Sequence, residues 1–194
     1  MTGIAETITG SNFTGSTSAS FGAGVTVSNF TVVSDTSITV TIDIAAGATA
    51  GARNVQVTNL TGTGTGSGLF TVNTVTTLGA PAPINLGHMG VANSPVTASS
   101  TGTITTNGTS WQVTAKDQKA SNPGFMNTSV DGTGTKLNNK LKIGKTASPS
   151  TDADQGITYS AGDTALPLYV SQTIVSGDTA GSYSIVITFT VSTP

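Results

Sequence analysis

The chain has 194 residues, of which 36% are hydrophobic and only 8% are charged, and its formal net charge is −2. This weak acidic balance gives no basic surface for nucleic acid or an anionic membrane, and the apolar content is too high for a disordered protein. There is no cysteine, and no apolar run reaches the roughly 20 residues that a membrane-spanning helix needs.

The first part of the chain, residues 1–74, carries the two-residue apolar period of half-buried β-strands. The period is strict in "SITVTIDI" (37–44), where Val and Ile alternate with Ser, Thr and Asp. Valine and isoleucine alternating with hydroxyl side chains are typical of antiparallel sheets with one face in a core. Further strands are predicted at 18–22, 25–33, 53–59 and 69–73, and the glycine-rich stretch "TGTGTGSG" (61–68) is predicted to be a loop.

Several of these stretches together resemble the IPT/TIG family of immunoglobulin-like domains. The resemblance covers about residues 7–73, and it rests on "ITGSNF" (8–13), "SDTSITV" (34–40), "AGARNVQV" (50–57) and the closing "FTV" (70–72). It implies an immunoglobulin-like β-sandwich over residues 1–74. In this family a strand that ends in a proline-containing turn precedes the "ITGSNF" stretch, whereas only "MTGIAE", without proline, is available here.

The first sandwich is therefore expected to lack its leading strand and to have an open sheet edge. Two explanations stay open. The sequence could begin within a longer protein, and "MTGIAE" would then pair as a stub of the missing strand. Alternatively, a neighbouring subunit supplies the strand, or the N-terminal residues themselves reach into a neighbour.

Residues 75–83, "VTTLGAPAP", are predicted to form a short linker, because they contain two prolines and little periodicity. Residues 84–194 are predicted to form a second sandwich. Within it, "TGTITTNGTSWQVTA" (101–115) predicts a hairpin with Asn107-Gly108 in a type I′ turn. In "GDTAGSYSIVITFTVS" (177–192), Tyr183, Ile185, Ile187, Phe189 and Val191 alternate with Ser184, Val186, Thr188 and Thr190. The stretch is similar to the last strands of immunoglobulin-like domains in prokaryotic surface proteins. The predicted fold is thus all-β, with two tandem immunoglobulin-like antiparallel sandwiches and almost no helix.

A metal site is suggested by one acidic stretch. Asp152, Asp154 and Asp163 stand at positions one, three and twelve of a twelve-residue window, as the ligands of a calcium loop do. The window departs from that pattern, because its glycine falls at position five and its last carboxylate is the shorter aspartate. The alternative is a solvated acidic loop, and calcium is the only cofactor that the sequence suggests.

Four of the seven basic residues lie in "KLNNKLKIGK": Lys136, Lys140, Lys142 and Lys145. Leu141 and Ile143 are expected to face one way and the lysines the other. The pattern predicts an edge strand that lysines protect against unwanted pairing, and the alternative is a contact with an anionic polymer.

Three further residue types were candidates for chemistry or binding. Trp111 alternates in phase with Val113, which predicts a core position, while a carbohydrate site with Tyr159 or Tyr169 as a second stacking ring is the alternative. Lys116 or Lys119, with an asparagine and an aspartate, has the composition for an internal isopeptide bond, and the sequence leaves this open. His88 is the only histidine, and it is expected to be a surface or packing residue rather than part of a catalytic triad.

No residue set for catalysis is evident, so the chain is not expected to be an enzyme. The favoured hypothesis is an extracellular structural protein, a subunit or segment of a prokaryotic surface layer or filament that assembles through β-strand edges. Its expected partners are copies of itself or other surface proteins, with polysaccharide as a further candidate. The alternatives are a carbohydrate-binding or adhesin module and an accessory domain of a larger secreted enzyme.

Overall fold

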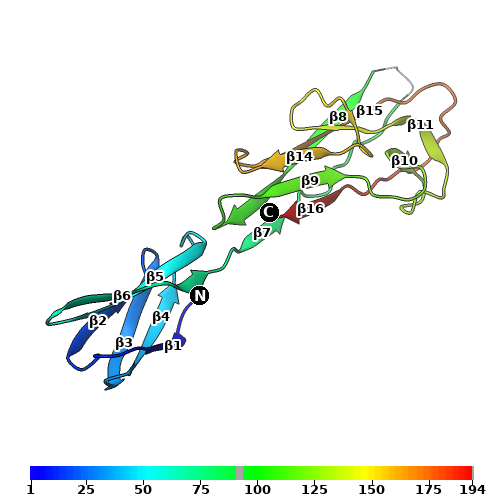
Figure 1. Ribbon diagram of the computed structural model, residues 1–194. Helices are drawn as coiled ribbons and strands as arrows, with labels where there is room; N and C mark the ends of the chain where they lie inside the picture. The colour runs from blue at the N-terminus through cyan, green and yellow to red at the C-terminus, as the bar shows by residue number, and fades with distance from the viewer. Residues whose placement is uncertain (91–93, 194) are drawn as a thin grey trace. The chain divides into compact units, whose positions relative to one another are not determined.

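The computed structural model describes residues 1–90 and 94–193, and it is built from β-strands alone within those ranges (Figure 1). The all-β prediction is therefore confirmed. The chain divides into two units: Met1–Thr76 with Thr106–Thr109, and Thr77–Thr105 with Ser110–Pro194. Within the described ranges, no helix has the length and hydropathy needed to cross a membrane.

The first unit is a sandwich of two three-stranded antiparallel sheets. One sheet has the order β1-β4-β3, formed by Ile4–Thr9, Ser37–Ile44 and Val25–Ser34. The other has the order β2-β5-β6, formed by Ser16–Ser20, Gly51–Asn59 and Gly62–Val72. The core between them is apolar because the inward positions of each strand carry Val, Ile or Phe. On β4 the predicted inward residues Ile38, Val40 and Ile42 are all buried.

The glycine-rich stretch 61–68, predicted to be a loop, is instead part of strand β6. It pairs with β5 in a tight hairpin, from Asn59 opposite Gly62 to Val55 opposite Gly66. Threonines alternate with the glycines along this stretch, and threonine favours the extended backbone. The partner strand β5 thus overrides the flexibility of the glycines, and the loop prediction was wrong.

Strand β1 lies at an edge of its sheet, as the expectation of an open edge required. It pairs with β4 along its whole length, from Ile4 opposite Ile42 to Thr9 opposite Ser37. No other strand of the described residues pairs with its outer side. Residues 4–6 continue directly into 7–9 as one strand, so the interpretation of "MTGIAE" as a separate stub was wrong.

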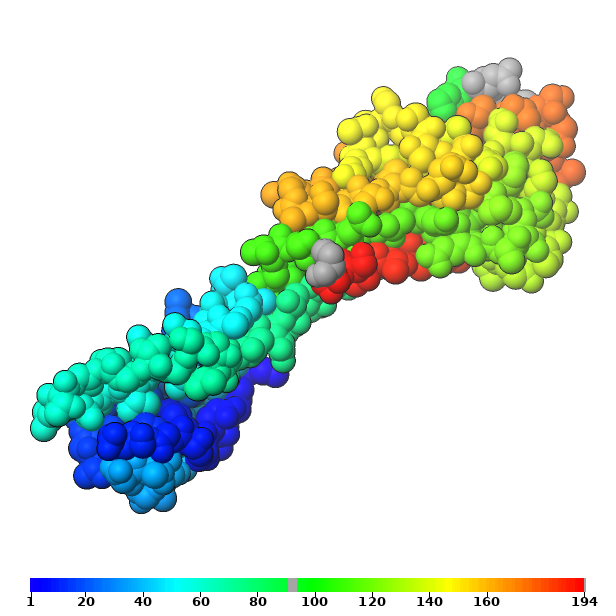
Figure 2. Space-filling view, viewed as in Figure 1, coloured from blue at the N-terminus to red at the C-terminus, as the bar shows by residue number. Residues whose placement is uncertain are grey.

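The second unit contains three sheets. The largest has the order β13-β12-β15-β8-β7, formed by Thr151–Asp152, Lys142–Gly144, Leu166–Gln172, Val96–Thr106 and Thr76–Gly79. A three-stranded sheet has the order β14-β9-β16, formed by Ile157–Ser160, Gln112–Lys116 and Thr188–Ser192. Figure 2 shows β16, in red, lying along β9, in green. A small sheet pairs β10 (Phe125–Asn127) with β11 (Lys136–Lys140).

The predicted hairpin at 101–115 was wrong, because β8 and β9 belong to different sheets. Neither Asn107 nor Gly108 has the positive φ that a type I′ turn needs. The Asn107 side chain is used elsewhere: its oxygen accepts from the Val75 N–H at 2.7 Å, and its Nδ2 donates to the Asn73 oxygen at 3.1 Å. The stretch expected to be a linker contributes β7, Thr76–Gly79.

Candidate functional site

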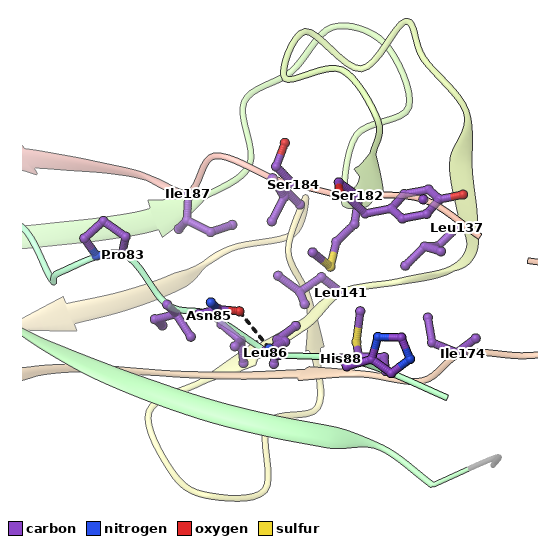
Figure 3. A pocket seen from close by; sticks show the side chains of 18 of the residues that line it. Pro83, Asn85, Leu86, His88, Leu137, Leu141, Ile174, Ser182, Ser184 and Ile187 are labelled. Carbon is purple, nitrogen blue, oxygen red and sulfur yellow. Dashed lines mark hydrogen bonds between the residues drawn. The ribbon is translucent and has the colours of Figure 1, made fainter. Parts of the chain in front are cut away.

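A groove of about 1120 Å³, lined mainly by apolar side chains, lies in the second unit (Figure 3). Its walls include two segments without regular strand pairing, residues 84–90 and 181–187. Both segments alternate in burial. Ile84 and Leu86 are half-buried on one wall, and Tyr183, Ile185 and Ile187 are half-buried on the other, while the residues between them are exposed. The sequence period predicted this alternation for the second segment but not for the first.

The floor of the groove belongs to the core of the unit. Five buried side chains line it: Met126, Leu137, Leu141, Leu168 and Val170. They belong to one cluster of packed apolar residues, with the half-buried wall residues resting against it. A cleft of this kind favours apolar side chains that arrive at alternate positions, rather than a charged or strongly polar ligand.

Within residues 1–90 and 94–193, the backbone of the 181–187 wall has few hydrogen-bond partners. Ser184 makes an isolated bridge with Asn127, through N–H···O bonds of 2.8 and 2.9 Å. Past Ile187 the chain joins β16, which is an edge strand in the order β14-β9-β16. An extended chain entering the groove would therefore meet free backbone donors and acceptors at its side and apolar pockets beneath it. These are the two requirements of β-strand addition.

His88, which was expected to be a surface or packing residue, lies among the groove-lining residues, and its side chain is exposed. Figure 3 shows it near Ile174. This agrees with the expectation of a surface or packing histidine. The surrounding groove is lined chiefly by aliphatic side chains, which supply neither a buried acid nor a base for it.

Three of the four predicted lysines meet the three predicted aspartates in the structure, while Lys136 lies over the Phe125 ring. Lys142 lies directly opposite Asp152 in the β12–β13 register, and their side chains are 2.5 Å apart. Lys140 pairs with Asp154 at 2.6 Å, and Lys145 pairs with Asp163 at 2.9 Å. Each of the three carboxylates therefore has its own ammonium partner.

Ion pairing shifts the pKa of Asp154, Lys140 and Asp163. Burial raises the pKa of Asp154, but the hydrogen bond and charge of Lys140, together with hydrogen bonds from the Asp154 backbone and from Gln155, outweigh it, so the pKa lies below its ordinary value. The same hydrogen bond raises the pKa of Lys140. The hydrogen bonds from Lys145 and from the Ser160 N–H lower the pKa of Asp163.

The structure does not gather the predicted calcium ligands into one site. Among the described residues, no three His, Cys, Asp or Glu side chains lie close enough together to hold a metal ion. A calcium site at Asp152, Asp154 and Asp163 thus stays a prediction without a geometric counterpart.

The edge-strand interpretation of the lysine segment was wrong for Lys142. Strand β12 lies between β13 and β15, so Lys142 is half-buried within the sheet, where it pairs with Asp152 on the neighbouring strand β13. Leu141 and Ile143 are buried beneath it, 2% and 0% exposed, as the alternation predicted.

The comparisons with known proteins bear on the first unit. Residues 5–72 match the family model of the IPT/TIG domain. The first unit is an IPT/TIG domain. Phe13 of "ITGSNF", Ile38 and Val40 of "SDTSITV", and Val72 of the closing "FTV" are buried, which agrees with the motifs on which the resemblance rested. No curated protein and no solved structure was found to match the chain.

IPT/TIG domains are immunoglobulin-like modules that occur in extracellular, cell-surface and adhesion-type proteins. The matched region begins within β1, the strand whose outer side no other described strand pairs with. The IPT/TIG domain therefore offers a second open edge, in addition to the groove of the second unit.

Trp111 occupies the core position that its alternation predicted. It is 7% exposed and packs in a cluster with Val113, Ala115, Tyr159 and Leu166. Tyr159 is fully buried beside it. Trp111 is therefore not available to stack on a sugar, with either Tyr159 or the half-buried Tyr169 as its partner, and the carbohydrate alternative loses the ring on which it rested.

Proposed function

We propose that the chain is an extracellular structural protein, a subunit or segment of a prokaryotic surface layer or filament, and that it assembles by β-strand addition. The observation that carries the proposal is the groove between 84–90 and 181–187. It combines an apolar floor with walls whose backbone groups are largely free of strand partners. An extended segment of a neighbouring subunit would cover the apolar floor with its side chains and form hydrogen bonds with the backbone groups of the walls.

Two further features support assembly. The β1 edge of the IPT/TIG domain is open among the described strands, and natural sheets usually protect such edges with lysine, proline or a bulge. β1 contains neither lysine nor proline, and its pairing with β4 has no bulge. Only 8% of the residues are charged, which gives the surface little charge repulsion against association.

In the proposed mechanism, backbone groups provide the affinity for the incoming strand, and apolar side chains fix its register. Backbone N–H and C=O groups of the wall would bond to the incoming strand and provide affinity without reading its sequence. The pockets above Leu141 and Leu168 would accept every second side chain and thereby fix the register, because a shift by one residue points the apolar side chains outward.

The test is an assembly assay on the full chain with two neighbouring substitutions. Ile185 is half-buried on the groove wall, whereas the adjacent Val186 is 51% exposed on the opposite face. We expect wild-type protein and Val186→Asp to form regular filaments or sheets in electron micrographs, and Ile185→Asp to stay monomeric. The fluorescence of Trp111 establishes that each variant is folded.

If Ile185→Asp unfolds, Leu86→Asp on the opposite wall replaces it. Monodisperse wild-type monomers at high concentration would contradict the proposal. A folded groove variant that assembles as well as wild type would contradict it equally.

A further inference from the structure

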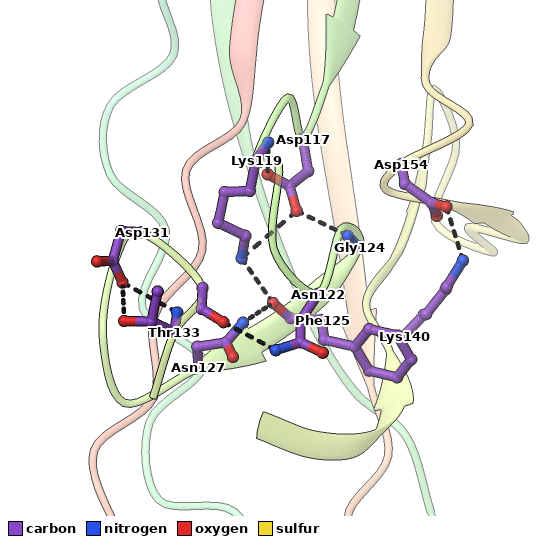
Figure 4. A network of polar contacts seen from close by, with 11 residues as sticks. Asp117, Lys119, Asn122, Gly124, Phe125, Asn127, Asp131, Thr133, Lys140 and Asp154 are labelled. Atoms are coloured by element: carbon purple, nitrogen blue, oxygen red, sulfur yellow. Dashed lines mark hydrogen bonds and ion pairs between the residues drawn. The ribbon is translucent and has the colours of Figure 1, made fainter. Parts of the chain in front are cut away.

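A lysine, an aspartate and an asparagine are buried together where β9 ends and β10 begins (Figure 4). Asp117 is 1% exposed and Asn127 is 0% exposed. The Lys119 side chain is 7% exposed. Charged side chains are seldom buried to this degree unless they are paired, and the proposed assembly assigns no role to these three.

The amine of Lys119 and the side-chain amide of Asn127 share one hydrogen-bond acceptor. Lys119 Nζ donates to the carbonyl oxygen of Phe125 at 2.8 Å, and Asn127 Nδ2 donates to the same oxygen at 2.7 Å. Lys119 Nζ also lies 3.4 Å from Asp117 Oδ2. The two nitrogens are therefore neighbours, and the carboxylate touches one of them.

Asp117 is held in place by the backbone. The Gly124 N–H donates to its Oδ2 at 2.7 Å, and the Lys119 N–H donates to its Oδ1 at 3.1 Å. By contrast, Asn127 Oδ1 is buried without a hydrogen-bond partner in the part of the chain that the structure describes. An unpartnered buried amide oxygen is costly, and its carbon is the electrophile that an adjacent amine would attack.

We propose that Lys119 and Asn127 become joined by an internal isopeptide bond, with Asp117 as the acid–base group. The ammonium of Lys119 gives a proton to Asp117, which leaves a neutral amine and a neutral acid. The amine Nζ then attacks Cγ of Asn127. The Nζ–Cγ bond forms, and the Cγ–Nδ2 bond breaks as Asp117 returns its proton to the leaving nitrogen, which departs as ammonia. Nζ gives up one of its two remaining protons to the Asp117 carboxylate, so the products are a neutral amide and a neutral acid.

This step balances without an oxidant or any co-reactant, and it removes the two buried charges whose burial is costly. The product keeps one N–H on the new amide, which can still donate to the Phe125 oxygen. The bond closes residues 119–127 into a covalent ring in a chain that has no cysteine for a disulfide. Of the two lysines that the sequence suggested, the structure selects Lys119, because Lys116 lies on β9, where it pairs with Thr188.

The test is the intact mass of the purified full chain. We expect the wild type to be lighter than its sequence by one ammonia, and fragmentation to show a branched peptide that joins Lys119 to Asn127. Lys119→Arg keeps the positive charge but has no attacking amine, so its mass should equal that of its sequence. Lys116→Arg is the matched control and should keep the deficit, while Asp117→Asn should lose it.

One competing product has the same mass. The Asn107-Gly108 sequence can cyclise to a succinimide, which also loses ammonia. Hydroxylamine cleaves a succinimide and leaves an isopeptide bond intact, and a succinimide would persist in Lys119→Arg. A wild-type mass equal to the sequence mass would overturn the proposal, and so would a deficit that Lys119→Arg retains.

Discussion

Tyr159 allows the packing of the second unit to be tested by mutation and pH together. The residue is fully buried, and its hydroxyl donates to the Pro167 carbonyl oxygen at 2.6 Å. Tyr159→Phe keeps the ring but removes the hydroxyl, so the Pro167 carbonyl oxygen loses this hydrogen bond. We expect the substitution to lower the free energy of unfolding at pH 7 by about 1–2 kcal/mol.

The difference between the two proteins should depend on pH in a definite direction. Burial, with a contribution from the nearby charge of Asp163, raises the pKa of Tyr159 to about 12. The unfolded tyrosine titrates near pH 10. Because the folded pKa is the higher one, the stabilisation is complete below about pH 10 and is lost as the pH rises from 10 to 12, with a loss of about 1 kcal/mol at pH 11.

The assay is urea unfolding of wild type and Tyr159→Phe at pH 7, 9 and 11. Trp111 is the only tryptophan and packs in the same cluster as Tyr159, so its fluorescence reports on this unit. Subtracting the two proteins cancels the other titrating groups, which both share. We expect the difference in free energy of unfolding between wild type and Tyr159→Phe to be constant from pH 7 to 9 and to become smaller at pH 11. A gap that stays constant or widens at pH 11 would refute the reasoning.

Three other predictions concern separate features. Ile38→Ala in the core of the IPT/TIG domain, where Ile38 is 0% exposed, should cost about 2–5 kcal/mol in the free energy of unfolding by circular dichroism. The lowered pKa of Asp154 means that its pairing with Lys140 stabilises the fold above the ordinary aspartate pKa, near 4, and that this is lost as the pH falls further. Asp154→Asn should therefore flatten the acid limb of a stability-against-pH curve, and an unchanged limb would contradict this. Because Asp152 and Asp163 are also lysine-bound, neither EDTA nor millimolar calcium should move the melting temperature, and a calcium-dependent rise would restore the metal hypothesis.

Local periodicity predicted the strands whose alternation is strict. β4 lies at the predicted residues 37–44, and Trp111 and Val113 are buried together, as their shared phase required. One face of each of these strands packs on a core, so the polarity of each residue indicates whether its side chain is buried or exposed.

The errors arose where a distant partner decides the structure. The stretch 61–68 reads as a flexible loop until β5 pairs with it. Asn107-Gly108 reads as a hairpin turn, but its flanking strands join different sheets. The Lys142–Asp152 pair depends on the β12–β13 register, which neither segment encodes by itself.

The groove was not predicted, although a signal for one wall was present. The alternation from Tyr183 to Val191 predicted a single long strand, but only Thr188–Ser192 is paired as one. Among the described residues, the remainder keeps the strand pattern, but its only strand pairing is the Ser184–Asn127 bridge. Such a mismatch between period and pairing becomes visible only once the sheets are known, and it marks the place where another chain would fit.

Hydrogen exchange of the backbone amides tests the proposed assembly most directly. The amides of 84–90 and 181–187 are to be followed in dilute protein and in concentrated, assembled protein. We expect these amides, apart from that of the bridged Ser184, to exchange rapidly in the monomer and to become protected on assembly, while those of β4 are protected in both states. Assemblies that form while the groove amides continue to exchange rapidly would contradict assembly through the groove.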